Sequence, residues 1–206
     1  MAETKHERPA PDGPAERAAV LYERASEARD AGDLDRALEL LAQAVAEDPT
    51  EAGLHAVAFH WCDEGGRASK AEQALRDGIE HAEDWTPFAV LLACRCHDTG
   101  RLEESETLCR RAIDAEPARP EAYSILGSTL LAAGRADEAE RLLRRGLEAD
   151  PTYAELHLNL AATLRALGRP AEALASARQA VRLDPESLPC RMGLQRLLAE
   201  AGEDAD

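Results

Sequence analysis

The residues best suited to chemistry lie in two short segments that contain histidine and cysteine. His60 and Asp63 belong to the first segment, and Cys94 and His97 belong to the second. Imidazole nitrogen, thiolate sulfur and carboxylate oxygen are all ligands that zinc accepts. Because residues three apart share a face of a helix, each pair could point the same way, and the four side chains together could form a tetrahedral metal site.

Two features of the sequence weigh against that metal site. The chain has no Cys-x-x-Cys pair of the kind that is typical of structural zinc sites. Three other cysteines, Cys62, Cys96 and Cys109, fall where small apolar core residues belong, and cysteine often serves as one. We therefore predict neither a metal nor a cofactor, and the site above remains the weaker alternative.

Motifs of enzymatic catalysis are also missing from the sequence. It contains no Gly-x-Ser-x-Gly, no glycine-rich phosphate-binding loop and no His-Glu-x-x-His. The many paired carboxylates are expected on solvated helix surfaces. We expect no enzymatic activity.

Charge and composition restrict the partners. The 206 residues include 24 Lys and Arg against 40 Asp and Glu, a formal net charge of −16. Such a chain repels nucleic-acid phosphates and anionic membranes. Aromatic residues make up only 3% of the chain, which disfavours β-sandwiches and barrels. No run of about 18 apolar residues and no secretory signal is found. Five cysteines do not suggest a disulfide framework, so we expect a cytoplasmic protein, and the alanine- and arginine-rich composition suggests a bacterial source.

The elements that position these residues follow a 34-residue period. Glycines recur at this spacing at Gly32, Gly66, Gly100, Gly134, Gly168 and Gly202. Prolines keep the same spacing at Pro49, Pro117, Pro151 and Pro185, with Glu83 in the missing place. Glycine favours the end of one helix and proline the end of the next. Each period therefore predicts a helix, a tight turn, a second helix and a short turn.

The period divides the chain into five repeats between two ends. The repeats cover 18–51, 52–85, 86–119, 120–153 and 154–187, after a disordered tail at 1–17 and before a capping helix with an acidic tail at 188–206. Within the fourth repeat, apolar residues recur at three and four residues, as in Tyr123, Leu126 and Leu130. Since one helix pair cannot bury its own apolar faces, neighbours must stack. The fold class is therefore all-α, an α-solenoid.

The fourth repeat resembles the tetratricopeptide repeat family. The matching residues are Tyr123, Leu126-Gly127, Leu130, Gly134, Ala139, Leu143, Gly146 and Pro151. The second repeat, with His55, Phe59 and Cys62, departs furthest from the pattern. The resemblance covers about nine tenths of the chain and implies that the first helices of successive repeats line a concave groove, which holds a partner peptide or helix.

Carrying the groove positions over by phase gives a set of candidate contacts, apolar in the centre and polar at the ends. They are Tyr22, Val57, His60, Val90, Leu91, Ile125, Leu131, Leu158, Asn159 and Arg165. An exposed apolar strip of this kind is typical of a partner site. We predict a protein-binding adaptor or scaffold. Two alternatives remain open: superhelical closure or the N-terminal tail covers the strip, or the chain associates weakly with itself as a scaffold.

Two further patterns bear on these alternatives. The closing segment places Arg191 and Gln195 where inner repeats carry core residues, as expected of a cap that opposes open-ended stacking. Arginines on the second helices follow glutamates by four residues, in Glu72–Arg76, Glu106–Arg110 and Glu140–Arg144. This order favours ion pairs along a solvated face rather than an anion-binding stripe.

Overall fold

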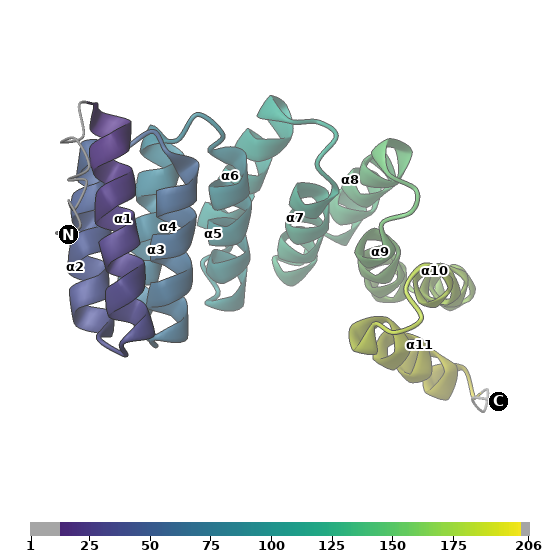
Figure 1. Ribbon diagram of the computed structural model, residues 1–206. Coiled ribbons are helices and arrows are strands. Elements are labelled where there is room, and N and C mark those ends of the chain that lie inside the picture. The colour runs from purple at the N-terminus through teal and green to yellow at the C-terminus, as the bar shows by residue number, and fades with distance from the viewer. Residues whose placement is uncertain (1–12, 203–206) are drawn as a thin grey trace, which may run out of the picture. The chain divides into compact units, whose positions relative to one another are not determined.

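The computed structural model describes residues 13–202 and shows only helices within that range. The helices, in order, are α1 (Pro14–Asp30), α2 (Leu34–Glu47), α3 (Ala52–Glu64), α4 (Ala68–His81), α5 (Thr86–Asp98), α6 (Leu102–Ala115), α7 (Pro120–Ala132), α8 (Ala136–Ala149), α9 (Ala154–Ala166), α10 (Pro170–Leu183) and α11 (Leu188–Ala201). They follow one another as helix pairs (Figure 1). The all-α solenoid predicted from the sequence is confirmed. Odd-numbered helices are called first helices below, and even-numbered ones second helices.

The periodic glycines and prolines end the helices as expected. All six periodic glycines have positive φ, from 67° at Gly66 to 84° at Gly32, a conformation that costs glycine little and other residues more. Four second helices end two residues before a proline, as α2 does at Glu47 before Pro49. The α4 helix ends at His81 without one.

The helices form two compact units, which divide within α5 between Phe88 and Ala89. Apolar residues of α1, α2 and α3 form the core of the first unit, with Leu41 and Ala44 fully or almost fully buried. The core of the second unit runs from α5 to α11 and includes Leu126, Leu143 and Leu164. Each core lies between first and second helices, so the remaining face of each first helix is left to form a surface.

One boundary differs from the sequence prediction. The first helix was expected after a tail at 1–17, but α1 begins at Pro14. Proline is favoured at the first position of a helix, and Glu16 in the first turn suits the helix dipole. Arg17 also forms an ion pair with Glu47 at 2.7 Å. The rest of the predicted tail, at 1–12, and the acidic residues 203–206 lie outside the described residues.

Arginine–glutamate networks join neighbouring repeats of the second unit. The predicted pairs Glu106–Arg110 and Glu140–Arg144 are present, each at 2.8 Å. The same two glutamates also bind an arginine from the next repeat, because Arg135 lies 2.6 Å from Glu106, and Arg169 lies 2.8 Å from Glu140. The glutamates therefore connect repeats as well as turns of one helix.

These networks predict how stability responds to acid. Hydrogen bonds from Arg135 and Arg110 lower the pKa of Glu106 below its ordinary 4.5, and those from Arg144 and Arg169 lower the pKa of Glu140, while burial opposes both shifts. A lowered folded-state pKa gives stability that is complete above about pH 4.5 and is lost as the pH falls through the lowered value. The double variant Glu106→Gln/Glu140→Gln should therefore be less stable than the parent at about pH 7, and the difference should be smaller at about pH 2.5. Urea unfolding at both pH values checks this, and a constant gap would contradict it.

Candidate partner-binding surface

In the first unit, the first-helix surface contains a small apolar cavity between α1 and α3. Its volume is about 370 Å³, and its lining includes Tyr22 and Val57, so the structure brings together two of the predicted contacts. The cavity is open because small residues, among them Ala19 and Gly53, face it. The acidic residues Asp48 and Glu51 also line it. It can accept an apolar group beside negative charge.

The Tyr22 side chain is held in place by an aromatic neighbour. Its ring stacks on Trp61 with 6.4 Å between ring centroids and 18° between planes. The Arg29 guanidinium also lies over the Trp61 ring, 5.9 Å from its centroid, and forms an ion pair with Glu64. Stacking of a cation and a second ring fixes the orientation of Trp61, and so that of Tyr22.

The histidines and cysteines of the possible metal site have separate neighbours. The Nε2 atom of His60 lies 3.4 Å from Glu64, and Nδ1 of His97 lies 3.2 Å from the Thr129 hydroxyl. Cys94 lies near Asp98, and the pKa of its thiol is raised by partial burial, then by the charges of Asp98 and Glu155. Between residues 13 and 202, no three His, Cys, Asp or Glu side chains form a group that could hold a metal ion.

The apolar contacts predicted for the second unit differ in accessibility. Leu91 on α5 is 43% exposed, whereas its neighbour Val90 is only 8% exposed and belongs to the core. Val90 therefore does not offer the exposed contact that the sequence predicts. Ile125 and Leu131 on α7 are partly buried against the core. Leu158 on α9 is also partly buried, because its tip lies against Gly193 of α11, where a Cβ atom would stand 2.6 Å away.

Two polar contacts of the second unit are tied to neighbouring helices. The Asn159 amide nitrogen donates to the carbonyl oxygen of Ser124 at 3.0 Å and to the hydroxyls of Ser124 and Ser128 at 2.9 and 3.2 Å. Its side-chain oxygen accepts no hydrogen bond from any other residue in 13–202. Arg165 pairs with Glu200 of α11 at 3.3 Å. Asn159 thus joins α9 to α7 and keeps one acceptor unused.

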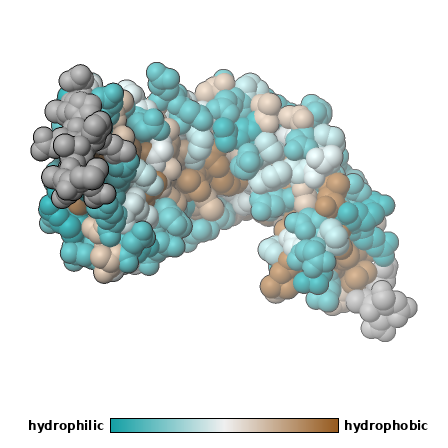
Figure 2. Space-filling view, in the orientation of Figure 1, coloured by the Kyte–Doolittle hydropathy of each residue, from teal (hydrophilic) through white to brown (hydrophobic). Residues whose placement is uncertain are grey.

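Sequence reasoning missed two exposed apolar residues on the last helix. Leu188 and Met192 on α11 are 59% and 58% exposed. They lie one helical turn apart, and no helix follows α11 in the described range to cover them. The signal was present, because Met192 stands in the same phase as Val90 and Leu158. Over the visible surface, apolar residues gather in separate patches among hydrophilic ones (Figure 2).

Sequence comparison identifies one family. A model described as tetratricopeptide repeat matches residues 28–94, 97–164 and 130–175. No curated protein shows significant sequence similarity to the chain. No helix within residues 13–202 is long and apolar enough to cross a membrane.

Solved structures share the fold at low sequence identity. One is a tetratricopeptide repeat protein from Parabacteroides merdae, with a TM-score of 0.73 and 17% identity over 91% of this chain and 74% of that one. The type IV pilus biogenesis factor PilW has a TM-score of 0.68 and 18% identity over 90% of this chain and 86% of that one. A third is YrrB, described as having an unusual peptide-binding site, with a TM-score of 0.63 and 18% identity over 85% of this chain and 90% of that one. These likenesses establish the fold.

Proposed function

Because the chain belongs to the tetratricopeptide repeat family, we propose that it is a protein-interaction module whose first-helix surface binds a peptide or helix of a partner. Protein–protein interaction is the role that this fold suggests, and one structural neighbour has a peptide-binding site. The observation that carries the proposal is Leu91, a large apolar residue 43% exposed on a first helix. A solvated leucine gains most when a partner covers it.

The neighbourhood of Leu91 indicates what the partner segment offers. Ile125 stands in the same phase on the next first helix, which extends the apolar surface. The unused side-chain oxygen of Asn159 can accept a hydrogen bond from a partner N–H group. Burial is the largest cause of the raised pKa of Cys94, and the negative charges of Asp98 and Glu155 raise it further. The best partner is an apolar segment flanked by lysine or arginine.

The test compares two matched charge substitutions. Leu91→Glu should abolish capture of a partner that wild-type protein enriches from a native lysate, because a carboxylate would have to be buried in the interface. Val20→Glu, which changes an apolar residue 37% exposed on α1, is the control and should leave capture of that partner intact. The partner is then purified and its affinity for all three proteins is measured by calorimetry. Equal affinity for wild type and Leu91→Glu would reject the proposal.

A second candidate function is self-association as a structural scaffold. Exposed Leu188 and Met192 on α11 favour it, because a second copy could cover them. Light scattering of the purified protein separates the two functions. The mass of one chain supports the interaction module, and a larger mass supports the scaffold.

A further inference from the structure

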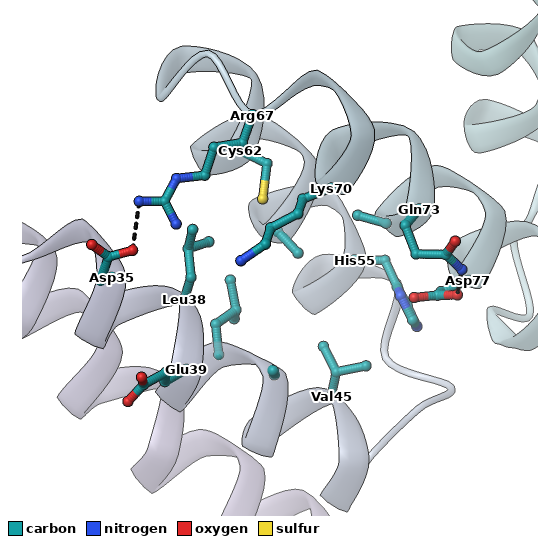
Figure 3. Close-up of a pocket in the computed structure, with 14 residues that line it drawn as sticks. Asp35, Leu38, Glu39, Val45, His55, Cys62, Arg67, Lys70, Gln73 and Asp77 are labelled. Carbon is teal, nitrogen blue, oxygen red and sulfur yellow. Dashed lines mark hydrogen bonds and ion pairs between the residues drawn. The ribbon is translucent and has the colours of Figure 1, made fainter.

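A second and larger cavity lies on the other side of the first unit, between the second helices α2 and α4. We call it the outer cleft. Its volume is about 480 Å³, and α3 forms its floor through His55, Ala58 and Cys62. Figure 3 shows the side chains of α2 and α4 converging on it from two sides. All of its lining residues belong to the first unit.

The cleft is open because the second repeat has its large and small residues interchanged. Ala58 stands where the fourth and fifth repeats carry Leu126 and Leu160, which are 0% and 4% exposed. The next residue, Phe59, stands where those repeats carry Gly127 and Ala161. One residue turns the side-chain direction by about 100° around a helix. The bulk that fills the core elsewhere therefore points away from this cleft.

A second position on the floor enlarges the opening. Cys62 occupies the place of Leu130 and Leu164, both of which are at most 2% exposed in their own repeats. Cys62 and Ala58 lie one helical turn apart, so the two reductions in size adjoin each other. The floor of the outer cleft thus lacks two leucine side chains that close the equivalent place further along the chain.

The rim of the cleft also differs from its counterparts. In the second unit, Arg169 bridges Glu140 at 2.8 Å and Glu172 at 2.6 Å across the equivalent place, and Arg135 does the same with its own glutamates. In the first unit, Leu38 replaces the first glutamate and Lys70 replaces the second. An apolar side chain and a lone cation therefore border the opening.

Lys70 is the cation of the rim that remains available. Arg67 pairs with Asp35 at 2.7 Å, Glu39 pairs with Arg36, and Gln73 donates to Asp77. Lys70 forms no ion pair with another residue in 13–202. Figure 3 shows its ammonium group directed over the cleft. Its positive charge also reaches Cys62, whose pKa it lowers against the larger, raising effect of burial.

We propose that the outer cleft is a binding site for a small amphiphilic carboxylate, an apolar chain or ring that carries one negative group. The volume lies within the range of about 300–1,000 Å³ that is typical of small-molecule sites. The apolar part would occupy the space above Ala58 and Cys62. The carboxylate would pair with the Lys70 ammonium at the mouth. This site opens between the second helices α2 and α4, so it is separate from the proposed partner-binding surface.

The experiment uses octanoate and octan-1-ol as probes, because they share an apolar chain and differ in charge. Isothermal titration calorimetry of the full chain should show that both bind and that octanoate binds more tightly. Ala58→Leu, which restores the residue of the fourth and fifth repeats, should abolish binding of both probes. Circular dichroism and the melting temperature establish that the variant is folded, and Cys62→Leu serves as a second cleft-filling variant.

A charge substitution tests the role of the cation. Lys70→Glu should weaken octanoate binding about tenfold or more and leave octan-1-ol binding unchanged, since a hydrogen-bonded charge contributes on that scale. Arg141→Glu, an exposed substitution on α8 with the same change in net charge, is the control and should affect neither probe. Unchanged octanoate affinity in Ala58→Leu, or no octanoate binding by the wild type at millimolar concentration, would overturn the proposal. So would equal weakening by Lys70→Glu and Arg141→Glu.

Discussion

Replacing Leu126 with alanine should lower the free energy of unfolding by about 2–5 kcal/mol. Leu126 on α7 is completely buried in the core of the second unit, where it belongs to the same cluster as Leu143 and Leu160. Removing three carbon atoms loses the burial of their apolar surface and leaves a void that neighbouring helices close only in part. Urea unfolding followed by circular dichroism measures the change.

The control for this prediction removes apolar atoms where no core surrounds them. Met192→Ala on α11 changes a side chain that is 58% exposed, so its effect should stay within about 0.5 kcal/mol. If Leu126→Ala cost no more than Met192→Ala, the core assignment of α7 would be wrong. The second repeat already has an alanine, Ala58, at the position that corresponds to Leu126, and Ala58 lines a cavity. Leu126→Ala would create a similar space in the fourth repeat.

Gly146→Val should destabilise the protein by about 3 kcal/mol through overpacking. A Cβ atom at Gly146 of α8 would lie 2.8 Å from the Cβ atom of Tyr123 and 3.1 Å from both methyl carbons of Leu156. Tyr123 and Leu156 are 2% and 0% exposed, so neither has room to move without displacing its helix. Thermal unfolding and urea unfolding should both show the loss.

Ala149→Val is the matched control for this substitution. It adds the same kind of branched side chain to the last turn of the same helix, but at an exposed position. The lower helix propensity of valine should then be the main effect, and it should reduce the free energy of unfolding by about 0.5 kcal/mol. Similar losses in the two variants would show that branching rather than close packing determines the effect.

The sequence predicts the fold closely because its signals are local. A glycine with positive φ and a proline that ends a helix act through their own backbone, so Gly134 and Pro151 mark their turns without reference to the rest of the chain. The 34-residue period then carries those local rules through all repeats. The start of α1 was misplaced because Pro14 was counted in the predicted tail at 1–17, whereas it occupies the first helical turn.

The candidate surface is harder to predict because exposure depends on which neighbours are present. Val90 and Leu91 are adjacent and equally apolar, yet one is buried and the other is exposed. Leu158 loses exposure because the residue facing it on α11 is Gly193. The outer cleft had a sequence signal in the row Ala58, Leu92, Leu126 and Leu160, where one member is small. Only the packing of α2, α3 and α4 turns that small residue into a cavity.

The six turn glycines should tolerate a side chain of D configuration better than one of L configuration. A Cβ atom built at Gly32, Gly66 or Gly168 meets no other atom within 4 Å, so these turns have space for a side chain. The obstacle to a side chain is instead the positive φ of these turns, which L-residues adopt only at a cost. A D-residue prefers that region of the backbone. In a chain made by chemical synthesis, D-alanine at these turns would keep the fold and restrict the unfolded chain, as an L-residue cannot.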